Sequence, residues 1–164
     1  MNEATPQMST DSEPLIDHDR LYKTAIIGDL VWMAENFDYG KLVDADCDDD
    51  GKAKQNYEEK WHYNNKEDGA CGGLYTWNVA VDNCPKDWHL PTLKEWGILF
   101  KFVESQENPE GCLSKLGMVP AGYWRCGSFC YCGLEGIWWA LPEDNQADSE
   151  KNAYACTWMW GGYL

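Results

Sequence analysis

Residues 71–99, CGGLYTWNVAVDNCPKDWHLPTLKEWGIL, contain the strongest structural signal in this chain. Thr92 is placed to cap a helix, and Glu95, three residues later, is placed to return the hydrogen bond as a capping box. The apolar side chains that follow have the spacing of one buried helix face: Trp96, Leu99, Phe100 and Val103. This pattern predicts a helix from Thr92 that ends before Asn108-Pro109.

The residues before this helix predict a second, shorter helix and a stiff connector. Leu74–Val81 places apolar side chains on one helical face. Pro85 and Pro91 fix φ on either side of Trp88-His89-Leu90, which limits how the chain enters the main helix. Because few Ile and Val residues are available, we expect an aromatic core formed by four rings: Trp32, Trp77, Trp88 and Trp96.

Outside this region the sequence predicts short strands. Lys23–Ile27 and Leu30–Ala34 flank Gly28-Asp29, which suits a hairpin with a type II′ turn. Four further strands are expected after the main helix: Met118–Trp124, Ser128–Cys132, Ile137–Leu141 and Ala153–Trp160. A hairpin, two helices and then a run of strands is an α+β order.

The composition fits one domain. The chain has 164 residues, of which 44% are hydrophobic and 14% aromatic, enough for a single core. Residues 1–20 are polar and acidic, without the basic and apolar regions of a signal peptide, and are expected to form a flexible leader. Residues 21–164 are then one domain, in which the charged residues 38–72 form a surface excursion.

The net charge narrows the choice of partners. A formal charge of −15 repels phosphate backbones and anionic lipids, which argues against nucleic acid and membrane surfaces. No apolar run approaches the roughly 20 residues needed to insert in a bilayer. Cations, neutral sugars and basic protein patches stay compatible with this charge.

Eight cysteines favour an exported protein with disulfides: Cys47, Cys71, Cys84, Cys112, Cys126, Cys130, Cys132 and Cys156. Buried free thiols are the alternative. Cys47 and Cys71 bracket part of the excursion and are candidates for one bridge. The last cluster, Cys126, Cys130 and Cys132, has a spacing open to zinc, but no histidine is nearby, so disulfides are favoured there too.

An acidic turn resembles half of a calcium loop. Asp46, Asp48, Asp50 and Gly51 match the first positions of an EF-hand, where carboxylates converge on Ca²⁺. The position of the bidentate glutamate holds Tyr57 instead. No cofactor is expected beyond this candidate Ca²⁺ site, and a solvated acidic turn is favoured over calcium binding.

The aromatic tail supplies the candidate ligand-binding residues: Trp138, Trp139, Trp158, Trp160 and Tyr163. Such rings stack on sugars or dock proteins, and core packing is the alternative, above all for Trp158 and Trp160. No catalytic residues are predicted, because the chain lacks H-E-x-x-H, G-x-S-x-G and phosphate-loop patterns. His89 is expected to be a hydrogen-bonded core residue.

Four segments together carry a family pattern: IIGDLVWMAENFDYG (26–40), residues 71–99, VPAGYW (119–124) and IWWALPEDNQADSEKNAYA (137–155). The chain resembles the Fibrobacter succinogenes major paralogous domain family of bacterial surface and secreted proteins. The resemblance implies a C-type-lectin-like fold, with two helices packed on short, mostly antiparallel strands. The HLPT-x-x-EW block is also similar to one in relatives of the formylglycine-generating enzyme.

The chain departs from the family pattern in two places. Gly111–Met118 replaces a longer loop that often contributes to the ligand surface, and the chain stops at Trp160-Gly-Gly-Tyr-Leu164 without the usual strand resembling SVRC. The resemblance implies that Cys84 would pair with the cysteine of that strand, with Cys156 as its substitute.

Three hypotheses follow for the function of the chain. The first is an extracellular or cell-surface, non-catalytic binding or adhesion module for a glycan or a surface protein. The second is a structural paralogous domain without a small ligand, and the third is an enzyme related to formylglycine generators.

Overall fold

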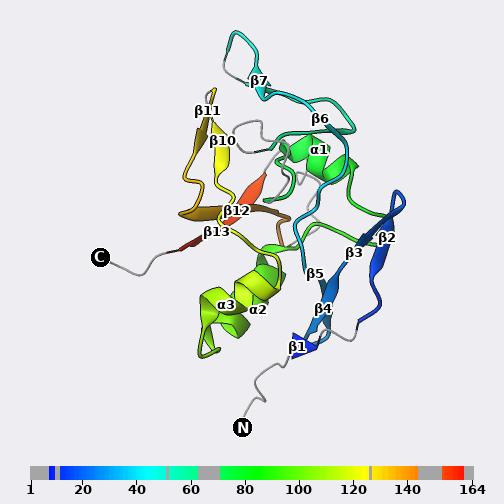
Figure 1. Ribbon diagram of the computed structural model, residues 1–164, viewed down its shortest axis with the longest axis vertical. Helices are drawn as coiled ribbons and strands as arrows, with labels where there is room; N and C mark the ends of the chain where they lie inside the picture. Colours follow the sequence, from blue (N-terminus) through cyan, green and yellow to red (C-terminus); the bar gives the residue numbers. More distant parts are fainter. Residues whose placement is uncertain are drawn as a thin grey trace.

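The computed structural model describes residues 8–9, 12–50, 52–62, 71–125, 127–143 and 153–160. These residues form a mixed α+β domain in which short strands surround three helices (Figure 1). The strand pairs are antiparallel except for one parallel pair, in agreement with the α+β expectation.

The first sheet has the order β1 (Met8–Ser9), β4 (Thr24–Ile27) and β5 (Leu30–Met33). The predicted hairpin is confirmed, with Ile27 paired to Leu30 across the turn. Gly28 occupies that turn with a φ of 62°, a conformation that a residue with a Cβ adopts only with strain.

Two short stretches of the expected flexible leader, residues 8–9 and 15–17, are paired in strands. β1 pairs with β4, and β2 (Leu15–Asp17) forms a second hairpin with β3 (Arg20–Tyr22). The turn between β2 and β3 is His18-Asp19, and both residues have positive φ. This hairpin is difficult to predict from the sequence, because its turn lacks the glycine that is usual in such a conformation.

The charged excursion contains regular structure of its own. Four two-residue strands cross it in two pairs: β6 (Lys41–Leu42) with β9 (Glu59–Lys60), and β7 (Asp46–Cys47) with β8 (Ala53–Lys54). Its end is anchored, because the backbones of Trp61 and Leu74 donate hydrogen bonds to each other at 3.2 and 2.8 Å. β7 lies at the opposite end of the molecule from β1 (Figure 1).

Three helices follow: α1 (Trp77–Asp82), α2 (Leu93–Glu104) and α3 (Pro109–Lys115). The capping box of α2 is confirmed. The Glu95 amide donates to Thr92 Oγ1 at 3.2 Å, and the Thr92 amide donates to the Glu95 carboxylate at 2.8 Å. The buried face of α2 consists of Trp96, Leu99, Phe102 and Val103, with Phe100 partly buried beside it.

The third helix corrects the prediction of a short loop over Gly111–Met118. Asn108 caps α3 by accepting a hydrogen bond from the Gly111 amide at 2.8 Å, and Pro109 occupies the first helical position. Both signals are present in the sequence, since proline is well tolerated at the start of a helix. Leu113, in the middle of α3, is completely buried.

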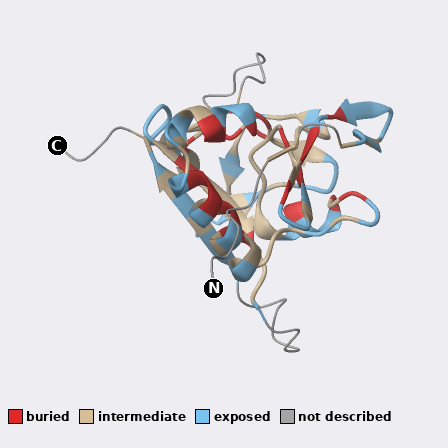
Figure 2. Ribbon diagram, turned by 90° about the horizontal axis from the view of Figure 1, so that it is seen from below, coloured by how far each residue is buried: buried red, intermediate tan, exposed pale blue. Residues whose placement is uncertain are grey.

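The remaining strands form two antiparallel hairpins: β10 (Tyr123–Arg125) with β11 (Ser128–Cys130), and β12 (Glu135–Ala140) with β13 (Tyr154–Met159). The main core lies between α2, α3, the first sheet and β12. Figure 2 shows its buried residues along the inner sides of the helices and strands.

Among the described residues, none of the proposed disulfides is formed. Six cysteines are free thiols: Cys47, Cys84, Cys112, Cys130, Cys132 and Cys156. The bridges from Cys47 to Cys71 and from Cys84 to Cys156 are therefore not formed, and Cys126 lies outside the described residues. Cys156 packs against the main core, whereas Cys84 lines a cavity elsewhere, which separates that pair.

Candidate functional site

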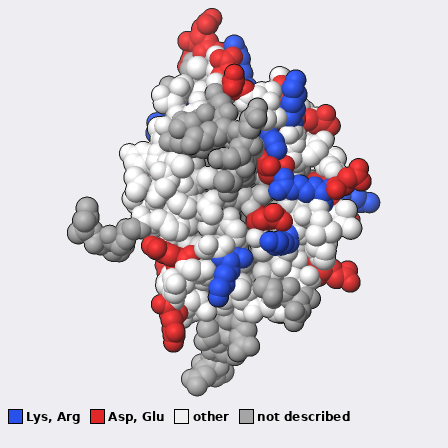
Figure 3. Space-filling view, in the orientation of Figure 1, with Lys and Arg blue, Asp and Glu red and all other residues white. Residues whose placement is uncertain are grey.

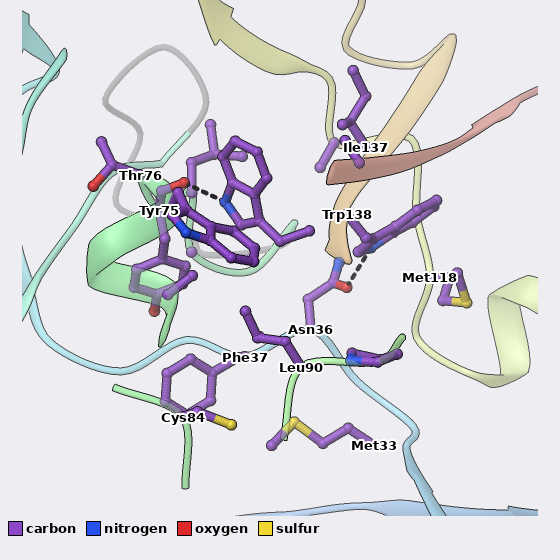
Figure 4. A pocket seen from close by; sticks show the side chains of 18 of the residues that line it. Met33, Asn36, Phe37, Tyr75, Thr76, Cys84, Leu90, Met118, Ile137 and Trp138 are labelled. Atoms are coloured by element: carbon purple, nitrogen blue, oxygen red, sulfur yellow. Dashed lines mark hydrogen bonds between the residues drawn. The ribbon is translucent and has the colours of Figure 1, made fainter. Parts of the chain in front are cut away.

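An aromatic cavity of about 1110 Å³ lies between β5, α1, the start of α2 and β12 (Figure 4). Its walls are dominated by indole rings. Eight of the ten tryptophans of the chain line it: Trp32, Trp61, Trp77, Trp88, Trp96, Trp124, Trp138 and Trp139. We call this space, with these eight residues as its walls, the aromatic cavity.

Asn36, just after β5, joins three segments at the base of the cavity. Its Oδ1 accepts a hydrogen bond from Trp138 Nε1 at 3.3 Å, and its Nδ2 donates to the Cys71 carbonyl at 3.0 Å. Gly72 makes this contact possible, because a Cβ there would stand 2.4 Å from the Cβ of Asn36. With a φ of 77°, Gly72 also has a conformation that favours glycine.

Tyr75 holds a second wall in place. Its carbonyl accepts from Trp139 Nε1 at 2.8 Å, and the Trp139 ring meets Trp77 edge-on at 5.6 Å. The Tyr75 hydroxyl donates to the Tyr39 carbonyl and accepts from the Tyr39 amide, both at 2.8 Å. Burial raises the pKa of Tyr75 well above its usual range, so its hydroxyl stays protonated.

Trp96 connects the cavity to the main core. Its ring lies 5.4 Å from Trp32 and 5.7 Å from Trp138, and its Nε1 donates to the Trp139 carbonyl at 3.2 Å. Ring contacts and N–H bonds together fix the orientation of this wall. The predicted aromatic core is confirmed for the pair of Trp32 and Trp96, whereas Trp77 packs on Trp139 instead.

Two indole donors of the cavity have no partner among the described residues. Trp32 Nε1 and Trp61 Nε1 are buried, and neither makes a hydrogen bond to that part of the chain. Trp61 is only 2% exposed and packs against Trp124, with ring centroids 5.0 Å apart and planes tilted by 56°. A buried donor without an acceptor is uncommon in a folded protein, and it often marks a place where a water or ligand binds.

The predicted ligand-binding residues separate into two groups. Trp138 and Trp139 line the cavity. Trp158 packs on Phe100 at 5.4 Å and Trp160 packs on Trp138 at 6.1 Å, both against the main core and outside the cavity lining. For these two, the ring contacts favour the core-packing alternative. Tyr163 lies outside the described residues.

Most of the cavity was not foreseen as a site. Trp32, Trp77, Trp88 and Trp96 were expected in a core, and Trp61 and Trp124 carried no prediction. The available signal was the number of tryptophans, ten in 164 residues, because one small core does not need so many large rings.

His89 corrects another expectation. Its side chain is 59% exposed at the edge of the cavity, so it is not a core residue. Its Nε2 lies 3.0 Å from both carboxylate oxygens of Glu95. Although burial opposes ionisation of Glu95, hydrogen bonds from Thr92 and His89 outweigh it and lower the pKa of Glu95.

The acidic turn does not assemble a calcium site in this structure. Among the described residues, no three His, Cys, Asp or Glu side chains form a group able to hold a metal. Asp48 Oδ1 instead accepts from the Asp50 amide at 3.1 Å and from the Lys52 amide at 2.8 Å. Asp46 accepts from the Cys47 amide at 2.8 Å, so two of the three carboxylates bond their own turn.

Two cysteines, Cys71 and Cys84, line the cavity together with Met33 and Met118. Burial raises the pKa of the Cys84 thiol to about 11, followed by a smaller contribution from Asp17. Because the thiolate is the reactive form, this Cys84 environment is a poor one for a nucleophile at neutral pH.

The comparisons assign the family. The model of the Fibrobacter succinogenes major domain matches residues 26–112, more than half of the chain, and the chain belongs to this family. The matched residues include those that bring Asn36, Tyr75 and Trp88 to the cavity. No curated protein and no solved structure gives a significant match to the chain. In the described part of the chain, no helix is long and apolar enough to span a membrane.

Proposed function

We propose that this domain is a non-catalytic binding module that holds a glycan in the aromatic cavity. One observation carries the proposal: eight tryptophans line a single space of about 1110 Å³. This volume is comparable to the roughly 300–1,000 Å³ of known ligand pockets. The rings of Trp96, Trp138 and Trp139 are already held by hydrogen bonds, so binding a ligand costs little further ordering.

A glycan is favoured over a surface protein because the site is concave and walled by rings. An indole face packs well on the C–H groups of a sugar, while protein-docking surfaces are usually broader and flatter. Trp138 and Trp139, two of the residues expected to bind a ligand, both line the cavity, which supports the proposal. A surface protein is the alternative ligand.

The proposal also includes a C-type-lectin-like fold and display of the domain outside the cytoplasm. A C-type-lectin-like fold is supported by the family membership and by short antiparallel strands packed against helices. Display outside the cytoplasm is supported by eight cysteines in a short chain. The strongly acidic composition favours neutral or basic partners at such a surface.

The proposal is tested by glycan-array binding, followed by titration of tryptophan emission with each positive glycan. Trp88→Ala should weaken binding, because Trp88 lines the cavity and is only partly buried. Tyr154→Ala is the matched control, since Tyr154 is an exposed aromatic residue on β13 outside the cavity lining. Equal loss of binding in both variants, or binding to no glycan, would contradict the proposal.

A structural domain without a ligand is the second candidate. The contacts of Trp96 with Trp32 and Trp138 favour it, because rings that pack on one another also stabilise a fold. In that case Trp88→Ala would change only the stability of the protein.

A further inference from the structure

We infer that the cavity selects neutral, hydroxyl-bearing saccharides, and that the indole N–H of Trp61 donates a hydrogen bond to a saccharide oxygen. This inference rests on the proposed function and specifies the chemical class of its ligand. It depends on two independent features, the hydrogen-bonding state of the indoles and the charges around the cavity.

The indole N–H groups of the cavity walls indicate that the ligand carries a hydrogen-bond acceptor. Trp96, Trp138 and Trp139 already donate to protein oxygens, whereas Trp32 and Trp61 donate to none within the described part of the chain. An indole N–H is a donor only. Its partner must therefore carry a lone pair, which a hydroxyl or ring oxygen has and a quaternary ammonium group lacks.

The charges of the cavity disfavour an anion. Among the described residues that line it, four are carboxylates and two are cations: Asp29, Glu35, Asp87 and Glu95 against Lys52 and Arg125. The formal charge of the whole chain, −15, has the same sign. Figure 3 also shows an area without charged side chains over β10, β12 and β13. An acidic saccharide would therefore meet repulsion on approach and inside the cavity.

Trp61 lines the cavity on a backbone that is held firmly in place. Its backbone is held by the paired hydrogen bonds with Leu74, and Gln55 Nε2 donates to the same Leu74 carbonyl at 2.9 Å. The Nε1 atom is covered, so the ring must turn for its N–H to meet a saccharide oxygen. Because Trp124 packs 5.0 Å away, such a turn changes the surroundings of two indoles and is expected to alter their fluorescence.

The test is a fluorescence titration of the full chain with defined probes. The neutral probes are the hexasaccharides of maltose, cellulose, xylan and chitin type. Hexagalacturonic acid represents acidic saccharides, and tetramethylammonium represents cations that bind aromatic rings. Trp61→Phe keeps an aromatic ring and removes the N–H, while Trp158→Phe makes the same change outside the cavity lining.

We expect at least one neutral hexasaccharide to change the emission saturably. Trp61→Phe should raise its Kd about fivefold, the effect of losing one hydrogen bond, while Trp158→Phe leaves it unchanged. Trp61→Phe should lower the melting temperature of the protein without added saccharide only moderately, because the smaller ring loses part of its packing against Trp124 but keeps an aromatic ring at this buried position.

Two results would overturn the inference while leaving the binding module intact. One is binding of hexagalacturonic acid or tetramethylammonium that is tighter than binding of every neutral hexasaccharide and is weakened by Trp88→Ala. The other is an unchanged Kd for a neutral hexasaccharide in Trp61→Phe. Absence of any response to every probe, with Trp88→Ala equally silent, would overturn both the inference and the proposed function.

Discussion

Asp38→Asn is expected to destabilise the domain, because Asp38 joins three segments through one carboxylate. Its Oδ1 lies 2.8 Å from Lys60 Nζ and 2.9 Å from His62 Nε2, and its Oδ2 lies 3.0 Å from Arg20 Nη1. The Asp38 side chain is 13% exposed and that of His62 is 6% exposed. Arg20 comes from β3, Lys60 from β9, and Asp38 from the segment after β5.

The magnitude follows from what the substitution leaves behind. Breaking a buried ion pair by removing one partner costs about 3–5 kcal/mol. Arg20 is 42% exposed, so loss of its ion pair with Asp38 contributes at most about 1 kcal/mol to this cost. The amide oxygen of the new asparagine still accepts one hydrogen bond, which reduces the cost further. We therefore expect the free energy of unfolding to fall by about 2–3 kcal/mol at neutral pH.

The loss should depend on pH in a defined direction. Burial alone would raise the pKa of Asp38, but hydrogen bonds from Lys60, His62 and Arg20 outweigh it and lower this pKa. A carboxyl whose pKa is lowered by folding stabilises the protein above its unfolded pKa of about 3.9, and this stability is lost as the pH falls through the folded pKa. The difference between parent and Asp38→Asn should therefore shrink as the pH falls from 4 towards 2.

Urea unfolding followed by tryptophan emission measures this difference at each pH. Asp49→Asn is the matched control, since Asp49 is an exposed aspartate and loses the same charge. The reasoning is refuted if the two variants have the same unfolding midpoint at pH 7. It also fails if the gap to the parent is unchanged at low pH.

Four further predictions concern the fold and the thiols. Thr92→Ala should lower the free energy of unfolding by about 1 kcal/mol through loss of the capping box, and unchanged urea midpoints would contradict this. Trp96→Ala should cost about 3–5 kcal/mol, because it removes a buried ring that packs on three others; cooperative unfolding near the parent midpoint would show otherwise. Gly72→Ala should reduce the yield of folded protein, because its methyl group would overlap Asn36, and a parent-like circular dichroism spectrum and melting temperature would disprove that. In native protein the exposed Cys132 should be alkylated quickly, whereas Cys112, whose pKa burial raises, should react only on unfolding. Mass spectrometry of timed samples measures the alkylation rate of each cysteine, and equal rates would contradict this prediction.

Local signals in the sequence were enough to predict the elements whose defining contacts join residues only a few positions apart. The capping box of α2 involves only Thr92 and Glu95, and the turn at Gly28 joins two adjacent strands. α3 had equally local signals in Asn108 and Pro109, but its residues were interpreted as a shortened loop. The family pattern was likewise readable, because its blocks are continuous in sequence and the family model matches them.

The sequence by itself therefore determined the α+β class, the family and the identity of the aromatic residues available for a site. Only the tertiary structure decided which of those residues face one cavity and which pack in the core. The bonds that make this choice are long-range: Trp138 to Asn36 spans 102 residues, and Trp139 to Tyr75 spans 64. Neighbouring residues in a strand point to opposite faces, so Trp158 and Ala155 of one strand meet different surroundings. A local pattern contains no information about the partner on either face, because that partner arrives from a distant part of the chain.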